Sequence, residues 1–236
     1  MVYVTSDLHG YSVEKFERFL RAAGFVEDDF CFVLGDAIDR GAESAELLRW
    51  LMLQPNVQLL RGNHEQMMLD CFFLFDEITD ESIARLESGA LYAYSLWMRN
   101  GGEATVQGLR RADPALRADM LEYLQATKLY ETVHVCGRDF LLTHAGLGGF
   151  SPEKHIRDYT PAELLWHRPT PDERYRDDIL TIFGHTPTGY LGGPACRGRA
   201  MKTDTWIDID TGAASGGDPM LLRLNDLREF YVSDLL

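Results

Sequence analysis

A chain of 236 residues, of which 45% are hydrophobic, can bury one substantial core, so we expect a single domain over residues 1–236. A formal net charge of −14 disfavours extended nucleic-acid binding, because nucleic-acid phosphates carry charge of the same sign. The sequence has neither an apolar run long enough to cross a bilayer nor a basic segment followed by an apolar signal region, so we expect a cytoplasmic protein without a membrane partner.

The first third of the chain alternates between two apolar patterns. Continuous apolar runs at 2–5, 30–34 and 57–60 predict buried strands, and apolar residues at helical spacing within 13–23 and 45–51 predict helices between them. A β-α-β-α-β order is typical of an α/β fold in which helices cover a largely parallel sheet. In such folds the functional residues lie beyond the carboxyl ends of the strands.

Residues 66–130 interrupt this alternation. Three stretches within them have helical periodicity, namely 67–75, 91–98 and 115–128. The segment Asn100-Gly101-Gly102 breaks the pattern between the second stretch and the third. We therefore expect a helical insertion, or cap, over 66–130, with the aromatic residues of 72–75 in its core.

The rest of the chain predicts that the sheet is mixed. Two hairpins are expected, 130–135 with 140–143 and 220–224 with 229–232. Two further strands are expected at 179–183 and 206–209. The segment Thr160-Pro161-Ala162-Glu163 combines a capping threonine, a proline at the first helical position and a glutamate three residues after the cap, so it predicts the start of a short helix.

Polar segments follow five of the predicted strands. They are Asp7-Leu8-His9, Gly35-Asp36-Ala37-Ile38-Asp39-Arg40-Gly41, Arg61-Gly62-Asn63-His64-Glu65, His144 and His185. Taken singly, Asp7-Leu8-His9 and the two later histidines are more typical of polar loops or hydrogen-bonded histidines than of a metal site, and a polar turn is an open alternative for the other two segments. Together they supply the carboxylate, amide and imidazole ligands that borderline divalent ions accept, so they predict a metal centre at the strand ends.

These motifs resemble the signature of the PPP family of serine/threonine protein phosphatases. The match runs from residue 7 to residue 185, and the segments around Asn63 and Trp166 are most similar to the phage lambda phosphatase and its bacterial relatives. The resemblance implies a metallophosphoesterase-like fold, a four-layer α/β/β/α sandwich of mixed β-sheets with a helical insertion. It also implies a binuclear centre with Asp36 as the shared ligand. One ion would be held by Asp7, His9 and Asp36, and the other by Asp36, Asn63, His144 and His185.

The resemblance assigns further roles around the metals. His64 would be the general acid that protonates the leaving alkoxide, and Asp39 would orient it. Arg40 and Arg61 would clamp the phosphoryl oxygens, for which the planar guanidinium is well suited. Arg168, shortly after Trp166, is a further candidate clamp.

Two parts of this assignment are less direct. Arg174 and Arg176 compete with Arg168 for the role of clamp, and His167 departs from the small or polar residue that the family more often has. Asp208 and Asp210 alternate along the strand predicted at 206–209, which is typical of a polar strand face. The resemblance gives this pair a structural place and not a metal.

The resemblance implies a metal-dependent phosphoprotein phosphatase, whose partner is a phosphorylated protein or peptide. It would hydrolyse phosphoserine and phosphothreonine monoesters, with phosphotyrosine left open, by attack of a hydroxide that bridges the two metals. We expect two divalent ions, manganese first, while the ligand set also admits iron, zinc or nickel. The oligomeric state and the physiological substrate stay open.

Two alternatives compete with this interpretation. A dinucleoside tetraphosphate hydrolase would share the metal scaffold, but that branch is expected to have aspartate where this chain has Glu65. A non-catalytic module that binds phosphorylated ligands would not need His64 and Asp39, which are both present. Turnover of a generic aryl phosphate distinguishes the module from an enzyme.

Overall fold

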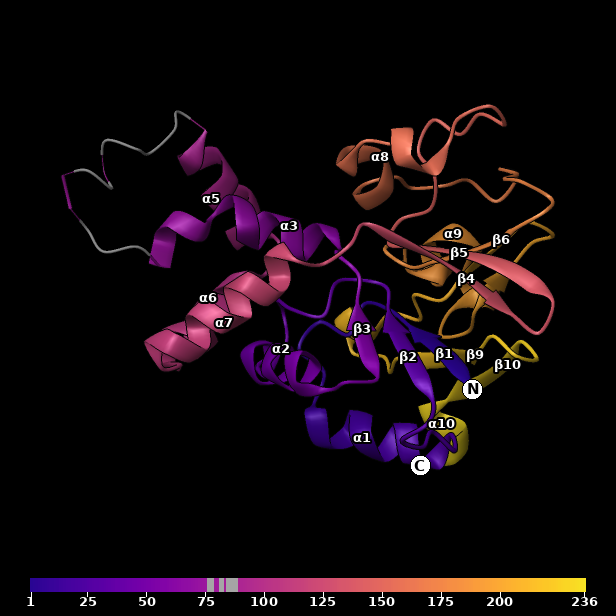
Figure 1. The fold of residues 1–236 in the computed structure, drawn as a ribbon, viewed down its shortest axis with the longest axis horizontal. Helices are drawn as coiled ribbons and strands as arrows, with labels where there is room; N and C mark the ends of the chain where they lie inside the picture. Colours follow the sequence, from indigo (N-terminus) through magenta and orange to yellow (C-terminus); the bar gives the residue numbers. More distant parts are fainter. Residues whose placement is uncertain (76–78, 81–82, 84–88) are drawn as a thin grey trace.

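The computed structural model describes residues 1–75, 79–80, 83 and 89–236 (Figure 1). Within these residues the strands form two five-stranded sheets. The first has the order β10-β9-β1-β2-β3, with bounds β1 Val2–Thr5, β2 Phe30–Val33, β3 Val57–Leu59, β9 Met220–Arg223 and β10 Arg228–Tyr231. Strands β1, β2 and β3 are parallel, whereas β9 and β10 are antiparallel additions at one edge, so the sheet is mixed as predicted.

The second sheet comes from the later part of the chain. Its order is β4-β5-β6-β8-β7, with bounds β4 Tyr130–Val135, β5 Arg138–Thr143, β6 Leu180–Phe183, β7 Met201–Lys202 and β8 Trp206–Asp208. The central strands β5, β6 and β8 are parallel, and the edge strands β4 and β7 are antiparallel. The parallel strands of each sheet therefore bring their carboxyl ends to one edge.

Helices connect and flank the sheets. The α-helices are α1 Val13–Ala22, α2 Ser44–Leu53, α3 Asn63–Asp70, α5 Ala90–Arg99, α6 Glu103–Arg111, α7 Pro114–Gln125, α8 Pro161–Leu165, α9 Thr188–Leu191 and α10 Val232–Leu235. Short 3₁₀ turns occur at Phe72–Phe75, Ile156–Asp158, Pro194–Cys196 and Ala213–Ser215. Among the described residues, no helix combines the length and apolar character needed to span a bilayer.

The two sheets pack face to face. Successive residues of a strand point to opposite faces of its sheet, so one set of side chains faces the helices and the other faces the second sheet. Tyr3 points to the side of α1 and packs in one cluster with Phe16, whereas Val4 belongs to a second cluster that includes Ile182 and Ile207 of the other sheet. A third cluster joins the outer face of the second sheet to α8 and the loops beside it. Helix, sheet, sheet and helix thus follow one another as layers, which confirms the predicted mixed α/β architecture.

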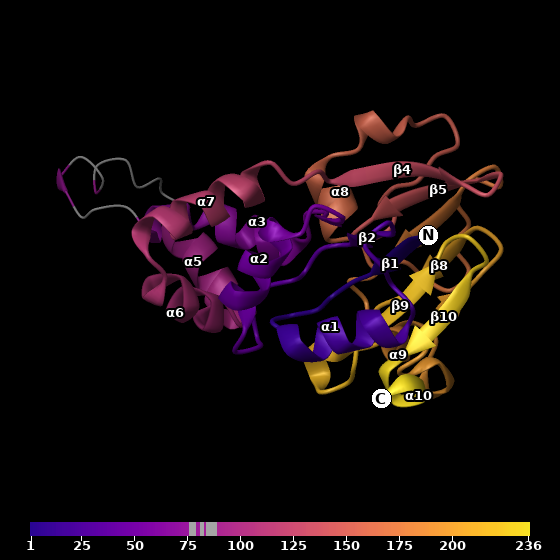
Figure 2. The ribbon, with the colours of Figure 1, turned by 60° about the horizontal axis from the view of Figure 1, so that its bottom comes forward.

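The helices from α3 to α7 gather at one end of the molecule, away from the second sheet (Figures 1 and 2). Their buried residues belong to the same cluster as α1 and α2, so the cap shares its core with the first sheet. Helix α6 was not predicted, because Thr105, Val106 and Gly108 weaken its helical propensity. Packing overrides propensity here: a Cβ on Gly108 would lie 2.7 Å from the Cβ of Ala45 on α2, so glycine allows the two helices to touch.

Candidate active site

The six predicted metal ligands lie together beyond the ends of strands from both sheets. All are buried, namely Asp7, His9, Asp36, Asn63, His144 and His185. Main-chain hydrogen bonds tie their loops to one another: Asp7 N–H donates to the Gly35 carbonyl (3.1 Å), and Gly184 N–H donates to the His144 carbonyl (2.8 Å). The structure therefore brings together every residue that the sequence predicted as a ligand.

Four of these ligand atoms converge around His144. Its Nδ1 lies 2.8 Å from the Leu34 carbonyl, which can only accept, so the proton belongs on Nδ1 and Nε2 carries a lone pair. That Nε2 lies 2.9 Å from Asn63 Oδ1, 3.2 Å from His185 Nδ1 and 3.4 Å from Asp36 Oδ1. Atoms with lone pairs that face one another at this range repel unless a cation lies among them. These four atoms are therefore suitable ligands for a metal ion.

A second set of ligand atoms lies on the other side of Asp36. His9 Nδ1 lies 3.0 Å from the Ile38 carbonyl, which leaves Nε2 as the lone-pair nitrogen. His9 Nε2 lies 3.6 Å from Asp36 Oδ2 and 4.0 Å from Asp7 Oδ1. Since Oδ1 of Asp36 faces His144 and Oδ2 faces His9, one carboxylate serves both sets, as a bridging ligand must.

The buried carboxylates are electrostatically unfavourable by themselves. Burial raises the pKa of Asp7 well above its ordinary value, and the neighbouring carboxylates of Asp210 and Asp36 raise it further. Burial likewise raises the pKa of Asp36, with Glu65 adding to the effect. Negative charge thus accumulates in a place from which water is excluded, and bound cations would compensate it.

The ligand imidazoles are held in the neutral form. Burial lowers the pKa of His144 to about 3 and also lowers the pKa of His9 and His185. A neutral imidazole is the form that coordinates metal. His185 Nε2 is buried and, among the described residues, has no hydrogen-bond partner. The other ring nitrogen, Nδ1, is the one that lies among the ligand atoms, 3.2 Å from His144 Nε2.

The backbone of the site is strained. Six of the predicted site residues have φ between 42° and 71°, namely Asp7, His9, Asp36, Asp39, Arg40 and His185. Among the described non-glycine residues, positive φ occurs otherwise only at Cys136 and Leu227, which lie at the turns of the two hairpins. A left-handed conformation costs a non-glycine residue about 1–3 kcal/mol, and such strain concentrates at functional sites.

His64 and Asp39 form a hydrogen-bonded pair beside the ligands. His64 Nδ1 lies 2.6 Å from Asp39 Oδ2, and His64 Nε2 faces Asp36 Oδ2 at 3.8 Å. Arg40 extends its guanidinium between the two imidazoles, with Nη2 3.0 Å from His64 Nε2 and Nη1 3.1 Å from His9 Nε2. The predicted acid, its orienting carboxylate and one predicted clamp therefore lie beside the predicted metal ligands.

The two other predicted clamps differ in their placement. Arg168 donates to Thr186 Oγ1 (3.2 Å) next to His185, and its charge contributes to the lowered pKa of that histidine. Arg61 instead directs its guanidinium to the end of α7, where it donates to the carbonyl of Gln125 (2.9 Å) and to Thr127 Oγ1 (3.2 Å). The structure thus brings Arg168 to the site, and contact between Arg61 and a phosphoryl group would require these bonds to exchange.

The competing arginines are engaged elsewhere. Arg174 pairs with Asp177 and Asp204, each at 3.0 Å, and Arg176 pairs with Asp178 on the exposed surface. His167, the departure from the family pattern, lies 2.9 Å from Glu173.

A model of the calcineurin-like phosphoesterase family matches residues 1–209. The chain belongs to this family. Among curated proteins, serine/threonine-protein phosphatase 2 of Escherichia coli (strain K12) is 38% identical over 218 residues, which cover 92% of this chain and 89% of that protein. The symmetrical bis(5'-nucleosyl)-tetraphosphatase of Acidovorax sp. (strain JS42) is 32% identical over 148 residues, 62% of this chain, and the chain spans only 44% of that relative's length. A solved structure described as a candidate diadenosine tetraphosphatase superposes with a TM-score of 0.63 at 18% identity, covering 97% of this chain and 91% of the other, which supports the fold.

Glu65 has a structural role in this calcineurin-like site that was not predicted from the sequence. Its carboxylate is fully buried and accepts the main-chain N–H groups of Asp36, Gly62 and Ala37, each at 2.8 Å. These bonds join the loop after β2 to the loop before α3, so Glu65 positions Asp36, the predicted shared ligand. A glutamate at the third helical position is a capping-box signal, but the partners outside its own helix could not be read from the sequence.

Asp208 and Asp210 correct an expectation. They were predicted to form a polar strand face, but both are buried. Asp208 is the last residue of β8, an interior strand of the sheet, and Asp210 lies two residues beyond it. Asp208 Oδ1 accepts the Asp210 N–H (2.9 Å), and Asp210 Oδ1 accepts the Gly212 N–H (2.9 Å). Burial raises the pKa of Asp210 to about 6, and the charge of Asp210 helps raise the pKa of Asp7. Asp210 is therefore an acidic neighbour of Asp7, and burial also raises the pKa of Asp208 well above its ordinary value.

We expect divalent metal to stabilise this phosphoesterase more strongly as the pH rises. The folded-state pKa values of Asp7, Asp36 and Asp208 lie above their unfolded values, so the stability that they contribute is present at acid pH and lost as the pH rises through the folded-state values. Thermal unfolding with EDTA or with manganese, from pH 5.5 to 8, measures the difference. A Tm increase that shrinks toward pH 8 would contradict this electrostatic account.

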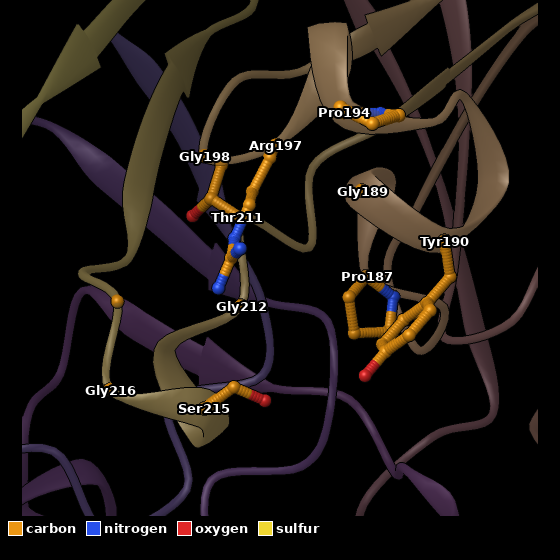
Figure 3. Close-up of a pocket in the computed structure, with 11 residues that line it drawn as sticks. Pro187, Gly189, Tyr190, Pro194, Arg197, Gly198, Thr211, Gly212, Ser215 and Gly216 are labelled. Atoms are coloured by element: carbon orange, nitrogen blue, oxygen red, sulfur yellow. The ribbon is translucent and has the colours of Figure 1, made fainter.

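A cavity of about 390 Å³ is lined by the segments that follow His185 and Asp210 in the chain. It is lined by Pro187, two residues after His185, and by Thr211, which follows Asp210. Figure 3 shows the side chains of Arg197 and Tyr190 extending from the 187–198 segment along its walls. Tyr190 is 82% exposed, and no hydrogen bond or ion pair of the Arg197 side chain occurs within the described part of the chain. A free cation and an exposed aromatic ring that line one cavity suit the body of an anionic substrate.

Proposed function

We propose that this chain is a metal-dependent phosphoprotein phosphatase that hydrolyses phosphoserine and phosphothreonine monoesters in proteins or peptides. The observation that carries the proposal is the position of Asp36 between two sets of ligand atoms, with the His64 and Asp39 pair beside it. We propose Asp7, His9 and Asp36 for one ion and Asp36, Asn63, His144 and His185 for the other, with manganese as the expected metal. When bound, the ions supply an acidified water and neutralise charge on the phosphoryl oxygens.

The residues of the chain perform the remaining tasks. Arg40 and Arg168 bind the non-bridging phosphoryl oxygens and orient phosphorus for in-line attack by water. A bond forms from the water oxygen to phosphorus while the bond from phosphorus to the ester oxygen breaks. Arg40 Nη2 donates to His64 Nε2 at 3.0 Å in the structure, so the guanidinium must turn to the phosphoryl oxygens and Nε2 must gain a proton before the ring acts as an acid. Protonated His64 then donates from Nε2 to the departing alkoxide, while Asp39 accepts the Nδ1 hydrogen bond that keeps the ring in position. A serine or threonine alkoxide is strongly basic, so this proton transfer matters most for such esters.

Dinucleoside tetraphosphate hydrolysis is the second candidate, since a tetraphosphatase is among the similar proteins. The more extensive match to a serine/threonine phosphatase, over 92% of the chain, favours phosphoprotein as the substrate. The test is a side-by-side assay of a phosphoserine peptide and diadenosine tetraphosphate with manganese, using EDTA and His64→Asn as controls. Faster turnover of the peptide supports the proposal, and a large preference for the dinucleotide contradicts it. Tight binding of the phosphopeptide without any turnover would instead indicate the non-catalytic module.

We expect the cavity lined by Pro187, Arg197 and Thr211 to contribute to binding of the peptide around the phosphate. Arg197→Ala should raise KM for an acidic phosphopeptide about threefold to tenfold, the effect of one exposed charged contact, and leave KM for p-nitrophenyl phosphate unchanged. Arg199→Ala is the matched control, because this nearby arginine is paired with Asp234 at 3.0 Å. Equal KM values for Arg197→Ala and Arg199→Ala on the peptide would exclude the cavity from substrate binding.

A further inference from the structure

Two cap residues make direct contacts with the carboxylate of the acid pair. The indole Nε1 of Trp97, on α5, donates to Asp39 Oδ2 at 2.8 Å. The hydroxyl of Thr105, on α6, donates to Asp39 Oδ1 at 2.5 Å and accepts the Asp39 N–H at 2.9 Å. With His64 at 2.6 Å, Asp39 therefore has three side-chain donors, two of which come from the cap.

Burial gives these hydrogen bonds their weight. The side chains of Asp39, Trp97 and Thr105 are all 0% exposed, so water cannot replace a lost donor. A buried carboxylate that loses a donor either shifts toward its remaining partners or binds them at a changed angle. Both outcomes move the imidazole of His64, whose orientation depends on Asp39.

The turn between α5 and α6 is shaped to keep these contacts. A Cβ on Gly102 would lie 2.6 Å from Trp97 Nε1, so only glycine leaves room for the indole in its present position. Gly101 has φ of +99° and its carbonyl accepts the Arg40 N–H at 3.0 Å. The same turn therefore positions the indole and fixes the backbone of the residue that follows Asp39.

We infer that Trp97 and Thr105 are positioning residues for the general acid, and that the cap thereby tunes proton donation to the leaving group. The inference rests on the proposed function for its kinetic consequence. The side-chain hydrogen bonds of Trp97 and Thr105 within the described part of the chain go to Asp39 and not to a predicted metal ligand. They act on His64 through Asp39, so their effect should follow the need for an acid and disappear when the acid is absent.

Comparing substrates whose leaving groups do and do not need a proton distinguishes a positioning role from a structural one. Trp97→Phe keeps an aromatic ring but removes the donor, and Thr105→Val keeps the shape but removes the hydroxyl. We expect each to lower kcat for a phosphoserine peptide about tenfold and kcat for p-nitrophenyl phosphate less than about threefold, because nitrophenolate departs without a proton. Thr105→Ser should restore peptide turnover. Equal losses on the two substrates would overturn the inference.

The matched controls lie elsewhere in the core. Trp206→Phe removes a buried indole N–H that donates to the Glu173 carbonyl, and Thr181→Val removes a buried hydroxyl without a hydrogen-bond partner among the described residues. Both should leave the ratio of peptide turnover to aryl phosphate turnover unchanged. In a His64→Asn background, Trp97→Phe should cause no further loss, because the two changes act through one group. A second, additive tenfold loss would show that Trp97 acts by another route.

One measurement separates failure of this inference from failure of the proposed function. The short hydrogen bond from His64 Nδ1 to Asp39 should give a downfield proton resonance in the NMR spectrum, whether or not the protein turns over phosphoesters. Trp97→Phe should shift or broaden this resonance and Trp206→Phe should not. An unchanged resonance in Trp97→Phe would overturn the inference. An inactive wild type would overturn only the proposed function.

Discussion

Replacement of Asp36 by asparagine is expected to abolish metal binding and phosphoester turnover together. Asparagine offers one oxygen where two are needed, since Oδ1 faces His144 and Oδ2 faces His9. We expect kcat/KM to fall by about three orders of magnitude or more, because without the metal set no group acidifies the attacking water. Metal content measured by elemental analysis alongside the kinetics tests the coupling.

The stability of this variant provides the control for misfolding. Burial raises the pKa of Asp36, so its ionised carboxylate opposes folding in metal-free protein at neutral pH, and the neutral amide removes that penalty. The His64 N–H, which donates to Asp36 Oδ1 at 3.0 Å, keeps an acceptor in asparagine. Metal-free Asp36→Asn should therefore have a Tm at least equal to that of metal-free wild type. Full metal content with normal activity in this variant would rule out Asp36 as the shared ligand.

Replacement of His64 by asparagine is expected to lower turnover while the metals stay bound. General acid catalysis contributes about 10² to 10⁴ in rate, and we expect kcat for a phosphoserine peptide to fall within that range. The loss on p-nitrophenyl phosphate should be smaller, because its leaving group needs no proton. Metal analysis and kinetics on both substrates test this separation.

The natural comparison for His64→Asn is His134→Asn. His134 also pairs with a carboxylate, Asp139, at 2.6 Å, but on the exposed surface of the β4–β5 hairpin. Its replacement should change neither metal content nor rate. An unchanged peptide rate in His64→Asn would remove the acid role from this residue.

That the predicted metal ligands lie close together could be expected from the sequence, because they follow strands. Asp7, Asp36 and Asn63 come directly after the parallel strands of one sheet, and His144 and His185 come after strands of the other. Parallel strands place their carboxyl ends at one edge, so the chain order already implies convergence. The resemblance to a family then supplied the roles, which spacing alone did not.

Contacts between distant segments could not be predicted. Trp97 reaches Asp39 across 58 positions and Thr105 across 66, and no local pattern marks either contact. Alternating polar residues usually indicate an exposed strand face, but Asp208 and Asp210 are buried. The sequence does not show that β8 lies between two other strands of its sheet. The guanidinium of Arg61 is suited to bind phosphate, but its direction could not be predicted, because it is set by hydrogen bonds to the end of α7.

Diffraction from crystals grown with manganese, recorded to use the anomalous scattering of the metal, tests the central claim most directly. Two peaks should lie on opposite sides of the Asp36 carboxylate, one near His9 and Asp7 and the other near His144 and His185. No peak within coordination distance of Asp36, or a single peak bound to other residues, would contradict the binuclear centre.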